Sequence, residues 1–389
     1  MTRSGRVAAL TGRRRIEVSQ FPVPEVDDES ILLGVGLAGV CGSDLHRYQD
    51  VGHTIDLPMP VVMGHEIAGR VLKVGARANE LMRCDHALAE GDRVVVYSHR
   101  QCGKCYWCRE HGHTARCDGD RPMSYGYRYG VVDAPPYFTG GFGDYLLVGP
   151  GSWLWKVPDA VSWEAAALVE PFSMGMRAVE RALSLPSWKH EQGLSFGGTA
   201  VVLGAGAIGV STALAARIAG AGRIVMLGAP ASALAVARAI GAADETIDIT
   251  QVSAEARIEQ VRALTSGGFG ADAVFEAAGV PAAFVEGLEM VRPLGTYVEL
   301  GCSVDTGRTV PVNVARHLTA KELALYTVSA QPPQAFGKAL RTIAATANRI
   351  DYGQLIGRVF EVADTAQAFE LMEHPTDKAI KVAVRGAGY

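Results

Sequence analysis

The sequence predicts an α/β protein in which a β-rich part precedes a doubly wound parallel sheet. Residues 1–160 are rich in glycine, turns and short β-type runs, which indicates mostly antiparallel strands. From Thr199 to about Val328, apolar runs alternate with alanine-rich helical stretches, which is typical of βαβ units with helices on both faces of a sheet. At 389 residues the chain exceeds what one hydrophobic core usually serves, so we expect at least two domains.

The β-rich part begins with two strand-like runs, residues 7–10 and 16–18, on either side of three arginines at 13–15. We expect a hairpin with the arginines exposed at its turn. Further strands are expected in the apolar runs that begin at residues 31, 66 and 92. Near residue 160 the sequence pattern changes from strand-like to helical. Ser162 is placed to cap a helix that begins with Trp163 and Glu164.

The second part supplies the strands and helices of the parallel sheet. The expected strands are 201–203, 224–227, 273–275 and 297–300, and the expected helices are 212–219 and 233–240. After Pro332 and Pro333 we expect an alanine-rich helix, a strand at 358–362, a helix at 364–373 and a strand at 379–384.

Charge and hydropathy exclude several classes of partner. The net charge of −4 gives no general attraction to nucleic acid or to anionic membranes. No stretch of 18 uncharged apolar residues exists to span a bilayer, and residues 1–10 lack the apolar core of a signal peptide. We therefore expect a cytoplasmic protein whose partner is a small molecule.

Four cysteines lie close together in the sequence: Cys102, Cys105, Cys108 and Cys117. Four thiolates around one ion are the ligand set of a structural zinc, with no open position for substrate. An iron–sulfur motif would need proline after its fourth cysteine, whereas Asp118 follows here. Disulfides are the other alternative, and the odd total of seven cysteines in a large chain argues against them. The spacing predicts a zinc lobe at about residues 98–120.

A glycine-rich turn follows the strand expected at 201–203. It contains Gly204, Gly206, Ile208 and Gly209 in a Gly-x-Gly-x-x-Gly pattern that leads into a helix. The glycines allow a tight turn and close approach to a pyrophosphate, and the helix N-terminus supplies amide donors. Because the turn lies between a strand and a helix, it predicts a dinucleotide site.

The choice between NAD and NADP stays open. The second strand is followed by Gly228 and Ala229, where an acidic residue would bind the ribose hydroxyls. Without a carboxylate a 2′-phosphate would not be repelled, yet no basic residue follows at once, and the nearest are Arg223 and Arg238. We expect the adenosine ribose beside Gly228 and Ala229.

A second set of metal-type side chains is scattered along the chain: Cys41, His65, Glu66 and Glu170. A lone cysteine usually packs as a small hydrophobe, and a lone His-Glu pair is usually polar surface. Together the set offers the cysteine, imidazole and carboxylate donors of a catalytic zinc, which keeps one exchangeable position. The segment 76–90 adds Cys84, Asp85 and His86, for which a surface loop insertion outweighs a third metal site.

Several motifs resemble those of zinc-dependent medium-chain dehydrogenase/reductases, the alcohol dehydrogenase-like proteins. The motifs occur in the family's order at 39–46, 64–69, 91–94, 140–145, 168–171 and 204–209, together with the four-cysteine lobe. Two features depart from the family: the interval between Cys108 and Cys117 is one residue longer than usual, and 76–90 is longer than common.

The resemblance implies a GroES-like catalytic domain at 1–170 and a Rossmann domain at 171–330, with 331–389 returning to the catalytic domain. It implies homodimers or homotetramers and two zinc ions per chain. Glutamate at position 170 resembles the polyol and threonine dehydrogenase branch. Whether Glu66 or Glu170 is the resting fourth ligand of the catalytic zinc stays open.

The predicted reaction interconverts an alcohol, in particular a secondary alcohol, and a carbonyl by hydride transfer with NAD or NADP. Ser43 and His46 are the candidate proton relay, because an imidazole with a pKa near 6.5 exchanges protons with water around neutrality. The alternatives are a reductase that prefers NADPH, a non-catalytic dinucleotide-binding protein and a redox sensor built on the cysteine lobe. The intact set of metal and relay residues argues against a non-catalytic protein.

Overall fold

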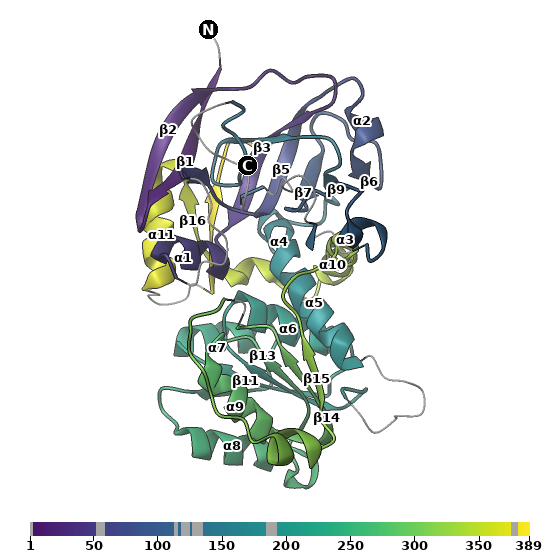
Figure 1. Cartoon of the computed structure of the whole chain (residues 1–389), viewed down its shortest axis with the longest axis vertical. Helices are drawn as coiled ribbons and strands as arrows, with labels where there is room; N and C mark the ends of the chain where they lie inside the picture. The colour runs from purple at the N-terminus through teal and green to yellow at the C-terminus, as the bar shows by residue number, and fades with distance from the viewer. Residues whose placement is uncertain are drawn as a thin grey trace. The chain divides into compact units, whose positions relative to one another are not determined.

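The computed structural model describes residues 3–51, 59–112, 116–117, 125–126, 135–183, 193–302, 304–374 and 380–389. These residues form two units, one of Met1–Glu170 with Pro332–Tyr389 and one of Pro171–Gln331 (Figure 1). Among the described helices, none is both long and apolar enough to cross a membrane.

The first unit contains a hairpin of β1 (Ser4–Gly12) and β2 (Arg15–Pro22), and β1 also pairs with β4 (Val61–Val62). All pairs in this sheet are antiparallel. Arg13 and Arg14 form the turn, and Arg14 has a φ of 54° in the left-handed region. The hairpin expected at the basic run is confirmed.

The larger sheet of the first unit has eight strands: β3 (Ile31–Gly39), β5 (Glu66–Val74), β6 (Arg83–Cys84), β7 (Arg93–Val96), β8 (Tyr145–Val148), β9 (Trp153–Lys156), β16 (Ile356–Glu361) and β17 (Lys381–Arg385). Their order is β16-β17-β3-β5-β7-β9-β6, and β8 also pairs with β3. Most pairs are antiparallel, as the short β-type runs predict. Strand β3 is buried along its whole length, so it forms the centre of the unit's core.

The helices of the first unit are α1 (Gly42–Gln49), α2 (Ala78–Leu81), α3 (Tyr106–Arg109), α4 (Trp163–Ala167), α10 (Pro333–Thr346) and α11 (Thr365–Glu373). The Ser162 hydroxyl accepts a hydrogen bond from the Ala165 N–H at 3.1 Å, which confirms the expected cap of α4. Helix α11 lies beside α1 although more than 300 residues separate them in sequence (Figure 1).

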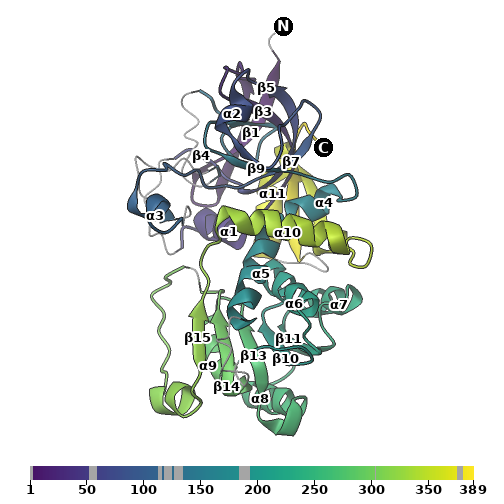
Figure 2. The ribbon, with the colours of Figure 1, turned by 90° about the vertical axis from the view of Figure 1, so that its right-hand side faces the viewer.

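The second unit contains a six-stranded sheet: β10 (Thr199–Leu203), β11 (Arg223–Gly228), β12 (Glu245–Asp248), β13 (Ala271–Glu276), β14 (Val291–Glu299) and β15 (Ala324–Thr327). The order is β12-β11-β10-β13-β14-β15, and every pair is parallel (Figure 2). This is the doubly wound sheet that the alternating sequence predicts.

The helices of this unit are α5 (Val169–Leu183), whose first residues belong to the first unit, α6 (Ala207–Ile218), α7 (Ala231–Ala239), α8 (Ala254–Ala263) and α9 (Pro281–Met290). Alternate residues of β10 face opposite sides of the sheet. Val201 packs in one core with Val261 of α8 and Leu288 of α9, whereas Val202 lies against Gly209 of α6. Helices therefore cover both faces.

Helix α6 begins five residues before the helical stretch expected at 212–219. The glycine-rich turn occupies this place in the sequence, and glycine weakens a helix. In the structure Gly206 is the N-cap, so Ala207 and Ile208 already belong to the first turn. The boundary was missed because the last glycine of the motif, Gly209, lies inside the helix.

Candidate active site and metal centres

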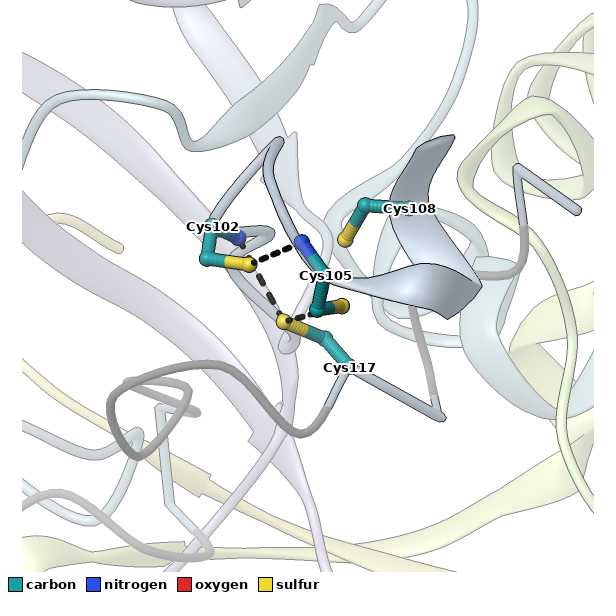
Figure 3. A group of neighbouring side chains, drawn as sticks. All are labelled: Cys102, Cys105, Cys108 and Cys117. Carbon is teal, nitrogen blue, oxygen red and sulfur yellow. Dashed lines mark hydrogen bonds between the residues drawn. The ribbon is translucent and has the colours of Figure 1, made fainter. Parts of the chain in front are cut away.

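The four cysteines of the lobe converge on one point. Their four Sγ atoms all lie within 4.8 Å of one another. Residues 113–115 and 118–120 of the lobe lie outside the described part of the chain. The Sγ atoms of Cys105 and Cys117 are 3.8 Å apart, and the Cys105 N–H donates to Cys102 Sγ at 3.3 Å (Figure 3). Helix α3 begins after Cys105 and presents Cys108 to the group.

The acidities of these thiols show the effect of crowding. Burial raises the pKa of Cys102, but hydrogen bonds from the N–H groups of Lys104 and Cys105 outweigh burial and bring it to about 6. Burial raises the pKa of Cys108 to about 12, and the neighbouring thiols add to the rise. Thiolates are the form that binds zinc, so a central cation would let all four cysteines ionise together. This donor set fits a closed structural zinc.

The second metal-type group is assembled in the core of the first unit. One ligand atom each of Cys41, His65 and Glu66 lies within 4.8 Å of the others. Cys41 follows β3 and caps α1, and His65 and Glu66 stand at the start of β5. The β3–β5 pairing places Gly39 opposite Glu66, where an added Cβ would lie 2.0 Å from Glu66 Oε2. Glycine at position 39 therefore leaves the room that the carboxylate occupies.

A buried lysine completes this group. Lys381 of β17 places Nζ 2.7 Å from both carboxylate oxygens of Glu66, and Nζ also donates to the Val40 carbonyl at 3.0 Å. The side chains of Lys381 and Glu66 are 4% and 1% exposed. Burial would lower the pKa of Lys381, but the charges of Glu66 and Cys41 raise it. The lysine thus stays charged and links the carboxylate to the backbone beside Cys41.

Asp44 connects two of the candidate ligands. Its Oδ2 accepts the Cys41 N–H at 3.0 Å, and its Oδ1 lies 3.3 Å from His65 Nδ1. Both side chains are almost fully buried, at 2% and 1% exposed. A carboxylate behind an imidazole fixes the ring orientation and leaves the other ring nitrogen for a metal.

Glu170 stands outside the group of three. It lies in the first turn of α5, and none of its carboxylate oxygens lies within 4.8 Å of the ligand atoms of all three of Cys41, His65 and Glu66. Its charge nevertheless reaches the site: burial chiefly raises the pKa of Glu66, Lys381 lowers it, and Glu170 raises it further. The three-residue set of thiol, imidazole and carboxylate fits a zinc ion with a position left for another ligand.

The two relay candidates lie on α1. Ser43 and His46 are three residues apart, a spacing that puts both side chains on one face of a helix. Burial lowers the pKa of His46, so its imidazole remains neutral further into acid than a free histidine. A neutral imidazole can accept a proton.

A cavity of about 360 Å³ follows the carboxyl ends of β10, β11 and β13 in the second unit. Of the predicted cofactor residues, Gly204, Gly206, Gly228 and Ala229 line it, whereas Ile208 and Gly209 do not. An added Cβ at Gly206 would meet no atom within 4 Å, so glycine keeps this space open for a ligand. At Gly209 a Cβ would lie 1.9 Å from the Gly204 carbonyl, which explains the close packing of helix on strand.

An ion pair forms the charged part of the cavity wall. Arg257 Nε and Nη2 bind the two carboxylate oxygens of Glu286 at 2.7 and 2.6 Å, and Nη1 donates to the Ile249 and Val252 carbonyls. Arg257 and Glu286 are the charged residues among the described residues of this wall. They were not predicted, because neither lies near the glycine motif in the sequence.

The segment 76–90 holds no metal-type group among the described residues. Cys84 is paired into β6 against β9, and burial raises its pKa to about 11. A thiol of this kind packs as a small hydrophobe. Pairing of β6 with β9 thus accounts for Cys84, and the loop insertion stays the prediction for this segment.

Lys381 was also missed in the sequence, although a signal for it exists. It lies in the run Ile380–Val384, where the four remaining residues are all apolar. A charged residue inside such a strand is buried only when it has a partner. The run therefore indicates a buried ion pair, but nothing in it identifies Glu66.

Known proteins resemble the chain over nearly its whole length. Residues 27–159 match the alcohol dehydrogenase GroES-like domain, and residues 207–345 match the zinc-binding dehydrogenase family. Sorbitol dehydrogenase of Bacillus subtilis is 27% identical over 381 residues, 97% of this chain and 96% of that protein. A probable alcohol dehydrogenase of Mycobacterium tuberculosis is 32% identical over 305 residues, 76% of this chain and 75% of that protein.

A solved alcohol dehydrogenase of Thermotoga maritima superposes with a TM-score of 0.85 at 26% identity, covering 98% of this chain and 99% of that one. The chain is an oxidoreductase that transfers a hydride between a nicotinamide cofactor and an alcohol or ketone. It belongs to the zinc-dependent medium-chain dehydrogenase/reductase family, in the polyol dehydrogenase branch.

Proposed function

We propose that the enzyme interconverts a secondary alcohol of a polyol and the matching ketone at a zinc site held by Cys41, His65 and Glu66. The convergence of these three side chains beside Lys381 is the observation that carries the proposal. The similarity to sorbitol dehydrogenase supports a polyol as the substrate. Glu170 is proposed as a further carboxylate of the site, within electrostatic reach of Glu66.

A zinc ion at this position supplies a Lewis acid, which for bound water moves the pKa from about 15.7 to about 7, roughly 12 kcal/mol of stabilisation. The protein residues supply the rest. His65 is oriented by Asp44, and Lys381 pairs with Glu66, whose carboxylate would be a further ligand of the zinc ion.

Ser43 and His46 are proposed to move the proton. In alcohol oxidation the carbon–hydrogen bond breaks and both electrons leave with hydrogen to the nicotinamide ring, while the hydroxyl proton leaves through Ser43 to His46. His46 then releases the proton to water. Its lowered pKa keeps the ring neutral at the start of each turnover.

The cavity of the second unit is the proposed dinucleotide site. The pyrophosphate would lie on the turn at Gly204 and Gly206 beside the N-terminus of α6, and the ribose beside Gly228. Because Arg257 and Glu286 neutralise each other, the described residues of the wall offer neither a repelling carboxylate nor a free cation to a 2′-phosphate. We therefore expect both NAD and NADP to serve, with kcat/KM values within about tenfold of each other.

We further propose a structural zinc at Cys102, Cys105, Cys108 and Cys117, so that one chain binds two zinc ions. These four cysteines form no disulfide within the described residues, which suits a cytoplasmic protein, because thiols stay reduced there. A homodimer or homotetramer remains the expectation from the family resemblance. Its test is the molar mass of the purified enzyme measured by light scattering.

The decisive experiment combines metal analysis with a substrate panel. Purified enzyme should contain two zinc ions per chain and oxidise polyols with a secondary hydroxyl faster than primary alcohols, with either cofactor. Preference for aldehydes with NADPH alone would favour the reductase alternative. Full turnover in enzyme that lacks metal at Cys41 would refute the proposal.

A further inference from the structure

Two carboxyl groups meet at the carboxyl ends of neighbouring strands in the second unit. Glu276 is the last residue of β13 and Glu299 the last of β14, and one oxygen of each lies within 4.8 Å of the other and of Cys302 Sγ. Glu276 is completely buried, at 0% exposed. The proposed hydride and proton transfers involve neither carboxyl group.

Glu276 holds the loop that follows β13. Its Oε1 accepts the N–H groups of Ala278 at 2.8 Å and Gly279 at 3.1 Å, and Oε2 accepts the Gly279 N–H at 3.3 Å. Ala277, Ala278 and Val280 of this loop line the proposed dinucleotide cavity. An added Cβ at Gly204 would lie 2.8 Å from the backbone of Ala277 and Ala278, so the loop also abuts the glycine-rich turn. The position of Glu276 therefore sets one wall of the cavity.

Glu299 holds the loop that follows β14 in the same way. Its Oε1 accepts the N–H groups of Gly301 at 3.0 Å and Cys302 at 2.8 Å. The two loops touch through glycines, because an added Cβ at Gly301 would lie 2.3 Å from the Gly279 nitrogen and 2.4 Å from Glu276 Oε2. The carboxyl pair thus lies where the two loops pack together.

One oxygen of this pair needs a proton. Glu299 Oε2 is buried and meets no hydrogen-bond donor within the described parts of the chain. If Glu276 carries a proton on Oε2, its hydroxyl can donate to Glu299 while its Oε1 still accepts from the loop. A buried acceptor without a donor is costly, so the geometry favours a shared proton.

The surrounding charges act in the same direction. Burial raises the pKa of Glu276 to about 8; the charge of Glu299, and the hydrogen bond that protonated Glu276 can donate to it, add to the rise and outweigh the lowering by the Ala278 and Gly279 N–H groups. Burial and the same two carboxylates raise the pKa of Cys302 to about 12, and that of Tyr297 well above its usual value. Glu286, the other acid that faces Tyr297, is bound to Arg257.

We propose that Glu276 and Glu299 share one proton that holds the 277–280 loop in the form that binds the dinucleotide, so that loss of this proton weakens cofactor binding. Glu276 is a positioning residue, because it acts on the dinucleotide through the 277–280 loop. The inference rests on the proposed assignment of the cavity to the dinucleotide. Above about pH 8 Glu276 loses its proton, and its repulsion by the charge of Glu299 across a poorly solvated contact separates the two loops.

The test is NADH binding to the zinc-loaded enzyme, followed by NADH fluorescence from pH 6.5 to 9.5. For the wild type the dissociation constant should be constant below pH 7.5 and rise up to about tenfold per pH unit above 8, as expected for a single linked proton. Glu299→Gln should keep the affinity at pH 7 and remove the pH dependence, because the amide donates to an ionised Glu276 without repulsion.

Two further variants separate the proton from mere packing. Glu276→Gln should bind as the wild type does at pH 7 and with no pH dependence, whereas Glu276→Ala should bind at least about fivefold more weakly at every pH. Glu259→Gln, a control that removes one exposed carboxylate of α8, should follow the wild-type curve.

A flat wild-type curve would overturn the inference, and so would a Glu299→Gln curve with the wild-type slope. Failure of Glu276→Gln to rescue binding relative to Glu276→Ala would also overturn it. If no form binds NADH at pH 7, the cavity assignment itself fails. That result differs from the others, because it contradicts the proposed function first.

Discussion

The two cysteine-containing centres of the first unit are assembled in different ways. The lobe takes all four sulfurs from residues 102–117, so the chain needs only a short turn and one helical turn to gather them. The other centre takes its groups from the end of β3, the start of β5 and from β17, which only the folded sheet brings together. The first is therefore a local device, whereas the second depends on the register of the whole sheet.

The electrostatic settings of the two centres also differ. The ligands of the lobe are all thiols, and backbone N–H donors bring the pKa of Cys102 to about 6, whereas burial chiefly raises that of Cys108 to about 12. The buried centre carries its own cation, because Lys381 lies against Glu66. We expect loss of a lobe ligand to act on stability, and loss of a buried-centre ligand to act on turnover.

The largest effect is expected for Cys41→Ser. Loss of the thiolate should remove one of two zinc ions and lower kcat by at least about a thousandfold, because the metal's charge stabilisation is worth several kcal/mol. Zinc content and steady-state rates check this, and NADH binding should persist because the cavity lies in the second unit. Turnover that survives the loss of zinc would break the distinction between the two centres.

The next effect is expected for Lys381→Met. In metal-free enzyme, removing this cation leaves Glu66 as an unpaired buried carboxylate, which costs about 3–5 kcal/mol of unfolding free energy in urea. Lys156→Met is the matched control: this lysine pairs with Asp92 but is 47% exposed, so it should cost less than about 1 kcal/mol. Adding Glu66→Gln to Lys381→Met should recover part of the loss, and equal costs for the two lysines would contradict the argument.

A smaller effect is expected for Cys105→Ser in the lobe. This variant should lose the other zinc ion and lower the melting temperature by about 5–10 °C, since metal bound only by the folded state adds to stability. The kcat at 25 °C should stay within about twofold of the wild type. A variant that kept its melting temperature but lost turnover would show that the lobe acts on catalysis.

The smallest effect is expected for His46→Gln, as a change in the pH profile of kcat/KM. Burial lowers the pKa of His46, so wild-type activity should fall only at a pH below about 6.5, the ordinary pKa of histidine. The variant should be slower by about tenfold near neutrality and should lack this acidic limb. An unchanged profile would remove His46 from the proton route.

The same lowered pKa has a consequence for stability. Because the folded state binds this proton less readily than the unfolded chain, His46 costs stability as the pH falls below about 6.5 and through its folded pKa. In the range where both states are neutral, above that value, it has no effect. Urea unfolding of the wild type and of His46→Gln between pH 5 and 7.5 measures the difference.

The parts of this molecule that follow from short-range patterns could be predicted from the sequence. The lobe depends on spacing alone, and the cap at Ser162 and the turn at Gly204 each follow from neighbouring residues. The doubly wound sheet follows from the alternation of apolar and alanine-rich runs. Each of these needs no knowledge of distant contacts.

The parts that depend on pairing across the chain could not be predicted. The contact between Lys381 and Glu66 joins residues 315 apart, and it exists because β17 inserts between β16 and β3. The Glu276–Glu299 contact requires β13 and β14 to be parallel neighbours that end at the same level. A glutamate at the end of an apolar strand gives no sign of whether its neighbour will be a base or another acid.

The position of β17 has a consequence for the order of events during synthesis. Residues 381–385 leave the ribosome only after the whole parallel sheet has been translated, yet they fill the gap between β16 and β3 in the first unit. Until then Glu66 has no counter-ion and the large sheet lacks an interior strand. The first unit therefore stays incomplete while the second unit is translated. During that time its large sheet has an unpaired strand edge, which chaperones can bind.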